Sequence, residues 1–504
     1  MYILSLDLGT TSIKVALVSE EGNVVGRAVQ EYSLFTPSPL EVELPVEVYW
    51  QSFKVALQDL FSRVSIPRSE IIALGMSVQG ETLVMIDEEG NPLGNAIVWL
   101  DNRAQKEAEL LAKEFTHQYA YSITGQVKIV PTWPATKILW VRHHQPDRFH
   151  KTYKFLLLED YFIYRLTGRF VAEGSLLSST LYWNIHTRQW WKEMLDYLGV
   201  KEDRLPEILE PGEVVGTILL EAAEELGLSQ DLKITTGALD QACGAVGVGN
   251  VKPGIFSENT GAALAICATV DRAFADPQMR MPCHYHAIPG LYMAHTFTSG
   301  GMVLKWYRDR FCSSEVETAE LMKRDSYDLL AEEAKTVPPG SGGLVMLPHL
   351  EGAMAPEANP KAKGVFFGFT LHHQRSHFVR SVMEGIACII RRNMEVLRDL
   401  GMEFEEVISL GGGAKSALWN QIKADLLNKR VVTTFNDQDA ACLGAAIIAG
   451  KAVGLYSNIE DACKKVVKKK QVYNPDPINR EVYDLLYTKY IKLYDSLVRM
   501  FEIG

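Results

Sequence analysis

The sequence lacks the features of membrane, secreted and nucleic-acid-binding proteins. No apolar run reaches the roughly 18 residues that span a bilayer. The first residues, MYILSLDLG, contain no basic segment ahead of an apolar stretch, so they do not have the pattern of a signal peptide. The net charge of −11 argues against a dominant basic face that would hold nucleic acid. We therefore expect a cytoplasmic protein without a membrane or nucleic-acid partner.

The cysteine and histidine patterns of disulfide-bonded and zinc proteins are also missing. The seven cysteines are odd in number and scattered, and none forms a CxxC pair. This arrangement fits a reducing compartment better than a disulfide framework. The histidines show no zinc spacing. One close pair, His284 and His286, is interpreted as structural.

The composition is that of an ordinary globular protein. Hydrophobic residues make up 47% and charged residues 22% of the 504 residues, which is typical of soluble folded domains. A chain of this length is too long for a single hydrophobic core, so we expect two domains.

The N-terminal part of the chain has the pattern of an α/β domain. Residues 2–6, 13–18 and 24–30 are short apolar or alternating runs, which predict three strands of a meander. Residues 46–64 change to a helical period with one apolar face. Residues 71–79 again have the composition of a strand, so strands and helix alternate.

The second half of the chain repeats this theme. Residues 255–270 (IFSENTGAALAICATV) predict a strand, a Thr-Gly turn and a strand, like the beginning of the chain, which indicates a faint internal duplication. Residues 405–427 predict a strand, a glycine turn and a helix, and residues 440–450 a helix of small side chains. Residues 233–240 predict a strand that runs into a loop. The glycines of 244–254 predict a domain junction, where they serve either as a hinge or for close packing of two elements.

The first hairpin turn has residues that suit phosphate binding. Between the first two predicted strands stand Gly9, Thr10, Thr11 and Ser12, whose main-chain N–H groups and hydroxyls can converge on phosphate oxygens. Asp7 would repel a bare polyphosphate but is useful if Mg²⁺ lies between them, and Lys14 adds a positive charge. The structural alternative is a tight polar hairpin in which Asp7 caps the turn.

Two further turns suit a nucleotide. The second hairpin turn contains Thr260 and Gly261, and two such turns, one opening each half, can clamp a polyphosphate from opposite sides. The later turn with Gly412, Gly413 and Ala414 lets a planar base approach the main chain closely.

The order of these motifs resembles that of the FGGY carbohydrate kinases, within the actin, Hsp70 and hexokinase superfamily. LDLGTTSIK resembles the first phosphate loop, and the further matching stretches cover nearly the whole chain in the same order. They are PATKILWVRHH, GALDQACGAVGVG, PGSGGLVMLPHLEGAMAP, GVFFGFTLHHQRSHFVRSVME and SLGGGAKSALW. Two positions depart from the family signatures, Thr132 and Phe369.

The resemblance implies the fold and the reaction. It implies an α/β protein of two actin- or hexokinase-like (ribonuclease H-like) domains that flank a cleft for ATP and sugar. We expect residues 1–246 to bind sugar and phosphate and residues 247–504 to bind the nucleotide. The family transfers the ATP γ-phosphoryl group to an alcohol, with Mg²⁺ as cofactor. Asp240 matches the catalytic base and Asp7 the magnesium and phosphate residue of the family, whereas the structural alternative for Asp240 is a helix N-cap.

The acceptor wall is expected from the stretches SVQGETLV and NAIVWLDNRA. Glu81 can accept hydrogen bonds from two neighbouring hydroxyls, and Trp99 can stack on an apolar C–H face or, alternatively, fill the core. Asp101 and Arg103 are expected to pair and brace their loop. The predicted substrate-binding residues are Gln79, Gly80, Glu81, Trp99, Asp101 and Gln241.

The motifs leave the acceptor open between branches of the family. QGET and GAMAP resemble the glycerol kinases, which carry an arginine at the position of Gly80. PKAKGVFFG and GAVGVG resemble the xylulokinases, which usually carry a Met-His pair at Val78-Gln79. A pocket widened at Gly80 favours a pentulose, D-xylulose first, then glycerol or a longer polyol, then gluconate. An Hsp70- or actin-like ATPase and a sugar-sensing pseudokinase are alternatives of other classes, and a homodimer stays open.

Overall fold

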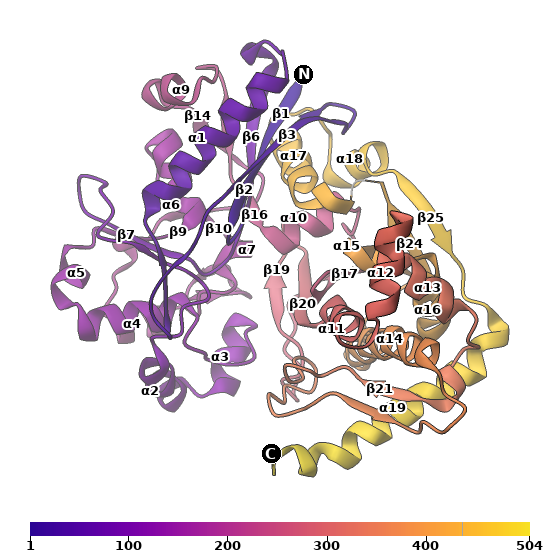
Figure 1. Ribbon diagram of the computed structural model, residues 1–504. Helices are drawn as coiled ribbons and strands as arrows, with labels where there is room; N and C mark the ends of the chain where they lie inside the picture. The colour runs from indigo at the N-terminus through magenta and orange to yellow at the C-terminus, as the bar shows by residue number, and fades with distance from the viewer. Residues whose placement is uncertain (436, 504) are drawn as a thin grey trace. The chain divides into compact units, whose positions relative to one another are not determined.

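The computed structural model describes residues 1–435 and 437–503, which form two compact units (Figure 1). Both units are discontinuous in sequence. The first unit comprises Met1–Lys252, Thr269–Met293 and Asp439–Lys468, and the second comprises Pro253–Ala268, Ala294–Gln438 and Lys469–Gly504. Each unit has a central sheet with helices packed on it, so the α/β prediction is confirmed. The predicted domain boundary after residue 246 stays a prediction.

The first unit is built on a sheet with the strand order β3-β2-β1-β6-β15-β14. β1 and β2 are antiparallel, as are β2 and β3, which confirms the predicted meander. β6 lies parallel to β1 on its other side, and β15 lies parallel to β6. The strands are β1 (Tyr2–Leu8), β2 (Ser12–Ser19), β3 (Val24–Glu31), β6 (Ile71–Val78), β14 (Val214–Thr217) and β15 (Lys233–Thr235); β16 (Ala238–Leu239) also pairs with β6.

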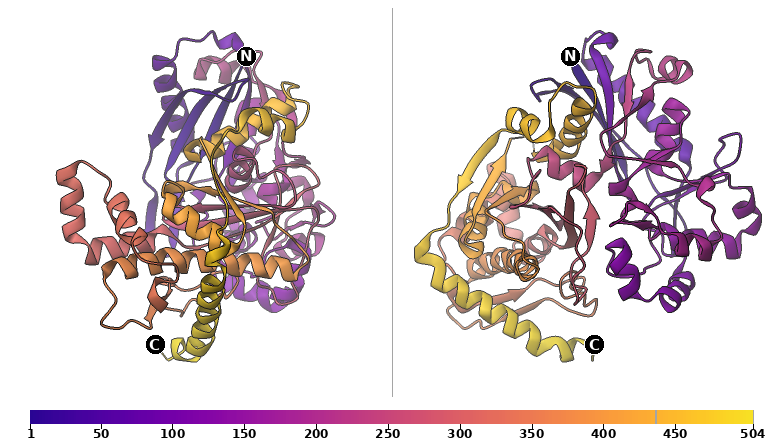
Figure 2. Two further views of the ribbon diagram at one scale, coloured as in Figure 1. Left: turned by 90° about the vertical axis from the view of Figure 1, so that its right-hand side faces the viewer. Right: turned by 180° about the vertical axis from the view of Figure 1, so that it is seen from behind.

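Helices α1 (Val46–Arg63) and α17 (Ala440–Ala452) pack on this sheet (Figures 1 and 2). α1 confirms the predicted helix and buries its apolar face, including Tyr49 and Phe53, against β2 and β3. α17 packs against β1 and β6, close enough that a Cβ atom at Gly75 would lie 2.4 Å from the Ala445 carbonyl oxygen. The small side chains of α17 therefore serve close packing on the sheet.

Helix α10 (Asp240–Gly247) corrects the loop that was expected after β16 and decides between the two alternatives for the first glycines of the predicted junction. The predicted loop is a helix that begins at Asp240. The first glycines of the predicted junction lie in this helix, and a Cβ atom at Gly247 would lie 1.8 Å from the Ala440 carbonyl oxygen of α17. Gly444 of α17 is as close to Cys243 of α10. Close packing rather than hinge motion explains Gly247, because no side chain fits between the two helices.

A smaller sheet and several short helices complete the first unit. The sheet has the order β4-β5-β8-β7-β9. Its strands are β4 (Phe35–Ser38), β5 (Glu41–Leu44), β7 (Leu83–Ile86), β8 (Ala96–Ile97) and β9 (Lys154–Leu157). The helices are α2 (Gln105–Phe115), α3 (His117–Thr124), α4 (Pro134–His144), α5 (Pro146–Lys151), α6 (Leu158–Thr167), α7 (Gly174–Leu177), α8 (Lys192–Leu198), α9 (Leu220–Leu226) and α18 (Ile459–Val466). The other strands are β10 (Val171–Glu173), β11 (Trp183–Asn184), β12 (Gln189–Trp190), β13 (Glu207–Leu209) and β19 (Cys283–Tyr285).

The second unit repeats the sheet plan of the first. Its strands follow the order β20-β18-β17-β23-β24-β25, with β17 antiparallel to β18 and parallel to β23. β23 and β24 are parallel and β24 and β25 antiparallel, as are the corresponding pairs of the first unit. The predicted internal duplication is therefore visible in the topology. The strands are β17 (Ile255–Thr260), β18 (Ala263–Val270), β20 (Tyr292–Ser299), β23 (Glu406–Leu410), β24 (Arg430–Thr434) and β25 (Lys469–Tyr473).

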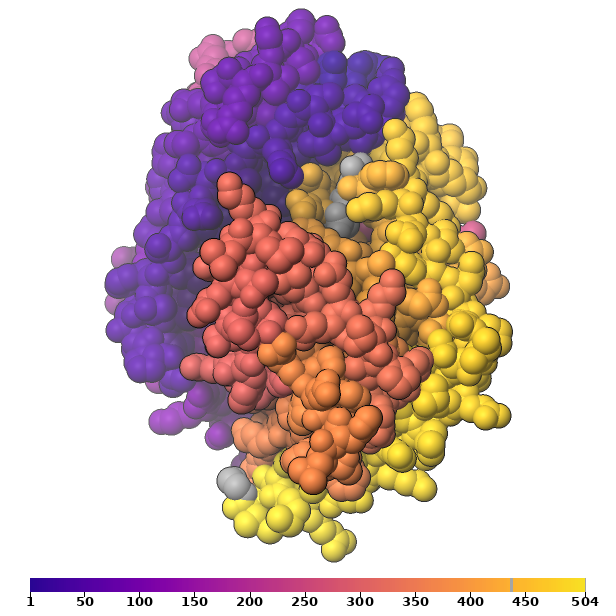
Figure 3. Space-filling model, turned by 45° about the vertical axis from the view of Figure 1, so that its right-hand side comes forward, coloured from indigo at the N-terminus to yellow at the C-terminus, as the bar shows by residue number. Residues whose placement is uncertain are grey.

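The helices of the second unit surround the long helix α14 (Arg375–Asp399) (Figures 1 and 2). α14 packs against α11, α13, α16, α19 and the hairpin β21–β22, so most of its side chains are buried. Figure 3 shows α11 to α13, in coral, as one block at the surface. These elements are α11 (Gly301–Phe311), α12 (Ser313–Met322), α13 (Ser326–Lys335), α15 (Gly411–Ala414), α16 (Ala417–Leu427), α19 (Arg480–Phe501), β21 (Val345–Leu347) and β22 (Val365–Phe367).

The structure also describes the cysteines and the helices of the chain. All seven cysteines are buried, and none of them forms a disulfide bond. Within residues 1–435 and 437–503, no helix combines the length and the apolar character that crossing a bilayer requires. The predicted cytoplasmic location stays a prediction.

Candidate active site

Asp7 lies near the end of β1, between a lysine and a serine on the two neighbouring strands. In the sheet register it faces Lys14 of β2 and Ser77 of β6. Its Oδ1 accepts a hydrogen bond of 2.8 Å from Ser77 Oγ. Burial raises the pKa of the Asp7 carboxyl, and the serine hydroxyl and the lysine charge offset part of this rise. The sheet thus holds a partly desolvated carboxylate beside the first turn.

The turn after β1 keeps the hydroxyl proton of Thr10 available. Thr10 Oγ1 accepts a hydrogen bond of 2.9 Å from Trp99 Nε1, and an accepting hydroxyl can still donate its own proton. The turn is closed by the Gly9 N–H, which donates to the Ser12 carbonyl at 3.0 Å. Thr11 lines a hollow of about 340 Å³ together with Glu31, Tyr32 and Ser33.

Lys14 shares an acidic neighbour that the motifs do not indicate. Its Nζ lies 3.9 Å from Asp439 Oδ1, and Arg27 Nη1 lies 3.1 Å from Asp439 Oδ2. Asp439 directly precedes α17, so a residue more than 400 positions away modulates the charge beside the first turn.

Asp240 is the first residue of α10 but does not cap it. The N-cap position belongs to Leu239, and no side chain caps this helix. Asp240 Oδ1 accepts a hydrogen bond of 2.7 Å from the main-chain N–H of the adjacent Gln241. Burial, followed by the charges of Asp7 and Glu81, raises the pKa of Asp240 to about 7. The predicted residues Asp7 and Glu81 therefore act electrostatically on Asp240, and a pKa near neutral suits a catalytic carboxylate.

Buried acidic side chains hold the segment that carries Asp240. Glu159 Oε1 accepts from the Gly237 N–H at 2.5 Å. Ser175 Oγ donates to Glu173 Oε1 at 2.7 Å and accepts from the Leu239 N–H at 2.9 Å. These bonds fix the main chain on both sides of Ala238, immediately before Asp240.

The segment after β6 brings Gln79, Gly80 and Glu81 together. Gln79 is 4% exposed and donates from Nε2 to Tyr49 Oη at 3.2 Å, and its Oε1 has no partner among the described residues. A Cβ atom at Gly80 would lie 3.2 Å from Leu239 Cδ1. The space expected at Gly80 is therefore partly filled by Leu239.

Glu81 stands beside a buried lysine. Its φ of 57° is a left-handed conformation, which is uncommon for a non-glycine residue and marks a constrained position. Burial raises the pKa of Glu81, against the opposing effects of Ser179 and Lys137. Lys137 donates to the carbonyl oxygens of Glu81 (3.2 Å) and Val98 (2.9 Å), and burial lowers its pKa to about 7.

Trp99 and Asp101 differ in their surroundings. Trp99 is half-exposed, which disagrees with the alternative of core filling. Asp101 is fully buried and accepts from Arg103 Nε and Nη2 and from the Val42 N–H, at 2.6 to 3.0 Å. Arg103 also bonds Glu43 at 2.7 Å. The expected brace between Asp101 and Arg103 is confirmed, and the contact of Asp101 with substrate stays a prediction.

The predicted nucleotide residues of the second unit lie against one another. Thr260 ends β17, and the Gly261 N–H donates to the Ala263 carbonyl at 2.9 Å to close the turn. The predicted glycine turn is the short helix α15, which contains Gly412, Gly413 and Ala414. A Cβ atom at Gly413 would lie 2.7 Å from Thr260 Cβ, so glycine is needed where these two segments meet.

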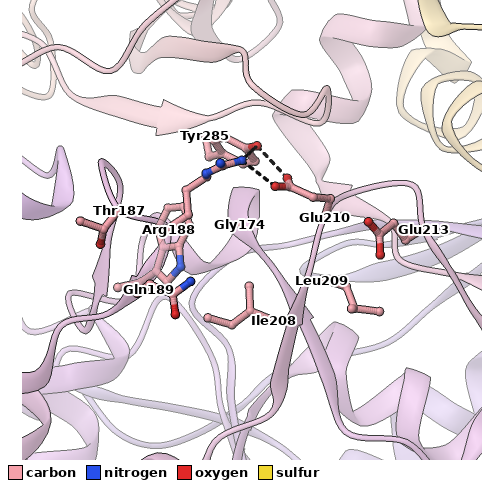
Figure 4. Close-up of a pocket in the computed structure, with 10 residues that line it drawn as sticks. Gly174, Thr187, Arg188, Gln189, Ile208, Leu209, Glu210, Glu213 and Tyr285 are labelled. Atoms are coloured by element: carbon pink, nitrogen blue, oxygen red, sulfur yellow. Dashed lines mark hydrogen bonds and ion pairs between the residues drawn. The ribbon is translucent and has the colours of Figure 1, made fainter.

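A separate pocket in the first unit contains none of the predicted site residues. It has a volume of about 270 Å³, and its lining includes Arg188, Glu210 and Tyr285 (Figure 4). Arg188 Nη1 and Tyr285 Oη both bond the Glu210 carboxylate at 2.7 Å. Its charged groups are thus largely paired with one another.

The comparisons with known proteins decide the family. The FGGY family of carbohydrate kinases matches with its N-terminal domain over residues 2–247 and with its C-terminal domain over residues 275–453. The chain belongs to this family. It is therefore a carbohydrate kinase, a phosphotransferase that uses ATP and has an alcohol group as acceptor, and the alternatives of an actin-like ATPase and a pseudokinase are not supported.

Two groups of relatives, which are named for different acceptors, are about equally similar to this FGGY kinase. A xylulose kinase of Bacillus subtilis is 29% identical, over 98% of this chain and 96% of the relative. A gluconokinase of the same organism is 30% identical, over 99% of this chain and 96% of the relative. A ligand-bound xylulose kinase structure from Lactobacillus acidophilus has a TM-score of 0.89 at 28% identity, with 98% of each chain covered.

The sequence analysis missed the hydrogen-bond and charge partners of the predicted site residues. Ser77 bonds Asp7, Lys137 lies beside Glu81, and Asp439 faces Lys14. In the second unit, Glu258 and Lys423 bond Thr260. Lys137 and Glu258 stand inside quoted motifs, so their charge at buried positions was a usable signal, whereas Asp439 and Lys423 gave none.

Proposed function

We propose that this kinase transfers the γ-phosphoryl group of Mg²⁺·ATP to a hydroxyl group of a neutral pentulose, D-xylulose first, giving D-xylulose 5-phosphate. The observation that carries the proposal is the burial of the carboxylates Asp7, Glu81 and Asp240, of which Asp240 has its pKa raised further by the charges of the other two. This group suits an uncharged acceptor with several hydroxyls.

Asp240 is the proposed general base. A carboxyl with a pKa of about 7 is about half ionised at neutral pH, and its ionised form accepts a proton and holds it more strongly than an ordinary aspartate does. The acceptor hydroxyl gives its proton to an Asp240 carboxylate oxygen while its oxygen attacks the γ-phosphorus, and ADP leaves. The bonds from Glu159 and Ser175 to the preceding main chain keep the carboxylate in position.

Asp7 fits a magnesium ion. Its Oδ1 is bonded to Ser77, and its Oδ2 has no hydrogen-bond partner among the described residues. Those residues contain no cluster of three His, Cys, Asp or Glu side chains suited to a metal, but Mg²⁺ usually takes only one or two carboxylates, with waters and substrate phosphates as its other ligands. When bound, the ion would neutralise phosphate charge. Thr10, Thr11 and Lys14 would bind phosphate oxygens beside it.

The proposed acceptor wall offers hydrogen-bond partners but few available cations. Glu81 and Gln241 supply acceptors and donors, and the half-exposed Trp99 supplies an apolar face for C–H groups. Arg103 is bound to Asp101 and Glu43, and Lys137 to main-chain carbonyls. A sugar acid would therefore bring its carboxylate towards acidic groups whose neighbouring cations are already engaged.

Gluconate is the second candidate acceptor. The gluconokinase of Bacillus subtilis is as similar to this chain as the xylulose kinase. The pKa of Lys137, about 7, would rise if a carboxylate bound near it, so a sugar acid has one potential partner. Glycerol and longer polyols come after these two.

The acceptor is tested by kinetics with a panel of compounds. ADP formation is measured with D-xylulose, D- and L-ribulose, D-fructose, glycerol, erythritol and gluconate at saturating Mg²⁺·ATP. We expect the highest kcat/KM for a pentulose. A higher value for gluconate would overturn the electrostatic argument, and a higher value for glycerol would overturn the argument from Gly80.

A further inference from the structure

A lysine that no predicted motif role explains lies fully buried in the second unit. The side chains of Lys423 in α16 and Glu258 in β17 are both 0% exposed. Lys423 Nζ lies 2.6 Å from Glu258 Oε1, 3.1 Å from Ser409 Oγ and 3.4 Å from Thr260 Oγ1. The three protons of the ammonium group thus have three acceptors, which compensates in part for its desolvation.

The hydroxyl group of Thr260 is hydrogen-bonded within the same network. Thr260 Oγ1 donates to Glu258 Oε2 at 2.5 Å, and Ser409 Oγ donates to Glu258 Oε1. A hydroxyl group has a single proton. While the network is formed, the Thr260 hydroxyl therefore has no proton left for a phosphate oxygen.

The network joins three elements at one point. Glu258 and Thr260 belong to β17, Ser409 to β23 and Lys423 to α16. β17 and β23 are paired in parallel, with Glu258 opposite Ser409. Each of the two strands leads directly into one of the predicted nucleotide turns, so the network fixes the starting points of both.

The turn after β17 has a main-chain donor that remains available. The Ala262 N–H has no partner among the described residues, and Ala262 is exposed. Its carbonyl, by contrast, accepts from Gly300 and Met302 at the beginning of α11. The Ala262 carbonyl is thus held by hydrogen bonds, whereas the Ala262 N–H group can donate to a ligand.

We propose that Glu258 and Lys423 are positioning residues of the nucleotide site, which hold the Thr260 hydroxyl inward so that the turn meets the phosphates with its main chain rather than with this hydroxyl. The inference rests on the proposed function, because it needs a nucleotide at this turn. It also explains a buried ion pair that has little reason to exist for stability alone, since desolvation offsets most of the attraction between buried charges.

A double-mutant cycle on nucleotide binding tests the inference. One side of the cycle is the apolar pair Glu258→Met/Lys423→Met, which keeps the volume and commonly preserves folding when both charges are removed together. The other side is Thr260→Val. The Kd of a non-hydrolysable Mg²⁺·ATP analogue is measured by calorimetry for the wild type, both variants and their combination.

We expect each side of the cycle alone to weaken binding at least fivefold, and Thr260→Val to add less than twofold in the apolar-pair background. If the hydroxyl bonded phosphate instead, Thr260→Val would cost the same factor in both backgrounds, and the inference would be wrong. It would also be wrong if the apolar pair left Kd unchanged. If the variant with the apolar pair does not fold, Ser409→Ala replaces it. This substitution removes the hydrogen bonds of Ser409 to Glu258 and Lys423 and leaves Thr260 unchanged.

The matched control is a second buried ion pair of the same unit. Arg380 Nε lies 2.8 Å from Glu384 Oε1, with side chains 6% and 1% exposed. Arg380→Met is expected to lower Tm but to leave the analogue Kd within twofold of the wild type. An equal loss of binding in this variant would show that the effect reflects general destabilisation, and would overturn the inference.

The binding assay separates this inference from the proposed function. If the wild type binds the analogue but phosphorylates no pentulose, the proposed acceptor is wrong and the cycle still decides the role of Glu258 and Lys423. If the wild type binds no nucleotide, the nucleotide site and the positioning role both fail.

Discussion

The two hairpin turns that open the halves of the chain have similar sequences but different chemistry. In the first unit, Thr10 accepts a hydrogen bond from Trp99 and keeps its proton. In the second unit, the hydroxyl group of Thr260 donates its hydrogen bond to Glu258. Both turns follow the corresponding strand of a sheet with the same order. The comparison teaches that a duplicated turn is specialised by its neighbours, which come from distant parts of the chain.

The carboxylates of the two units differ in the same way. Asp7, Glu81 and Asp240 are buried or close to like charges, and their pKa values are raised. Glu258 is instead bonded directly to the ammonium group of Lys423. The first arrangement suits exchange of a proton or binding of a metal ion, whereas the second suits holding a neighbour in place.

The largest effect is expected for Asp240, the proposed base of the first unit. Asp240→Asn keeps the size of the side chain but removes its ability to accept a proton. We expect kcat to fall at least ~100-fold, with the Kd of Mg²⁺·ATP within a few-fold of the wild type. Steady-state kinetics and calorimetry check this. Glu213→Gln, at an exposed acid of the same unit, is the control, and turnover retained in Asp240→Asn would remove the base assignment.

Thr10 gives the sharpest contrast with Thr260. Thr10→Val removes a hydroxyl whose proton is available, so a charge-assisted bond to phosphate worth about 1.5–3 kcal/mol is lost. We expect kcat/KM for ATP to fall about 10- to 100-fold, with Thr10→Ser close to the wild type. An unchanged value for Thr10→Val would mean that the two turns do not differ as the structure indicates.

The pH dependence of turnover reports the charge environment of Asp240. Its carboxyl must be ionised to accept a proton, and its pKa is raised from 3.8 to about 7. At saturating Mg²⁺·ATP, kcat/KM for the acceptor is expected to fall tenfold per pH unit below an apparent pKa between these two values, because the bound cation offsets part of the rise. Asp240→Asn should lack this acid limb. A profile of the wild type that is flat down to pH 4 would contradict the assignment.

A smaller effect concerns the buried acids behind Asp240. Burial raises the pKa of Asp160 to about 8 and that of Glu173 to about 7. Burial also raises the pKa of Glu159. In the unfolded chain these groups lose their protons near pH 4, so the folded state binds more protons and the free energy of unfolding falls as pH rises from 4 to about 8.

Thermal unfolding checks this dependence. We expect Tm to be at least about 2 °C lower at pH 8.5 than at pH 6. Glu159→Gln removes one of the titrating groups and should reduce the difference, while Glu213→Gln should not. An identical slope in Glu159→Gln and the wild type would show that this cluster does not titrate on unfolding.

Much of the fold was predictable from local patterns. The meander β1–β3, helix α1 and the hairpin β17–β18 were expected from apolar periodicity and turn residues, and the structure confirms them. The loop expected at Asp240 is a helix, because α10 packs on α17 through Gly247 and Gly444. No local pattern predicts that contact, since α10 ends at Gly247 and α17 begins only at Ala440.

The candidate site was predictable residue by residue but not as a network. The turns with Thr10 and Thr260 and the acid Asp240 stand in motifs that can be recognised. The residues that bond the motif residues come from other elements: Ser77 bonds Asp7, Trp99 bonds Thr10 and Lys423 bonds Thr260. A motif gives the residue type at a position, whereas the direction of a hydroxyl proton depends on which acceptor lies nearest in space.

The sequence by itself determined the family, the alternation of strands and helices and the positions of two glycine- and threonine-containing turns, because these depend on the identity and spacing of neighbouring residues. Only the tertiary structure decided which turn keeps its hydroxyl proton and which carboxylate has a cation. Those properties depend on burial and on distances of a few ångströms between residues up to several hundred positions apart, where electrostatic and hydrogen-bond energies change steeply.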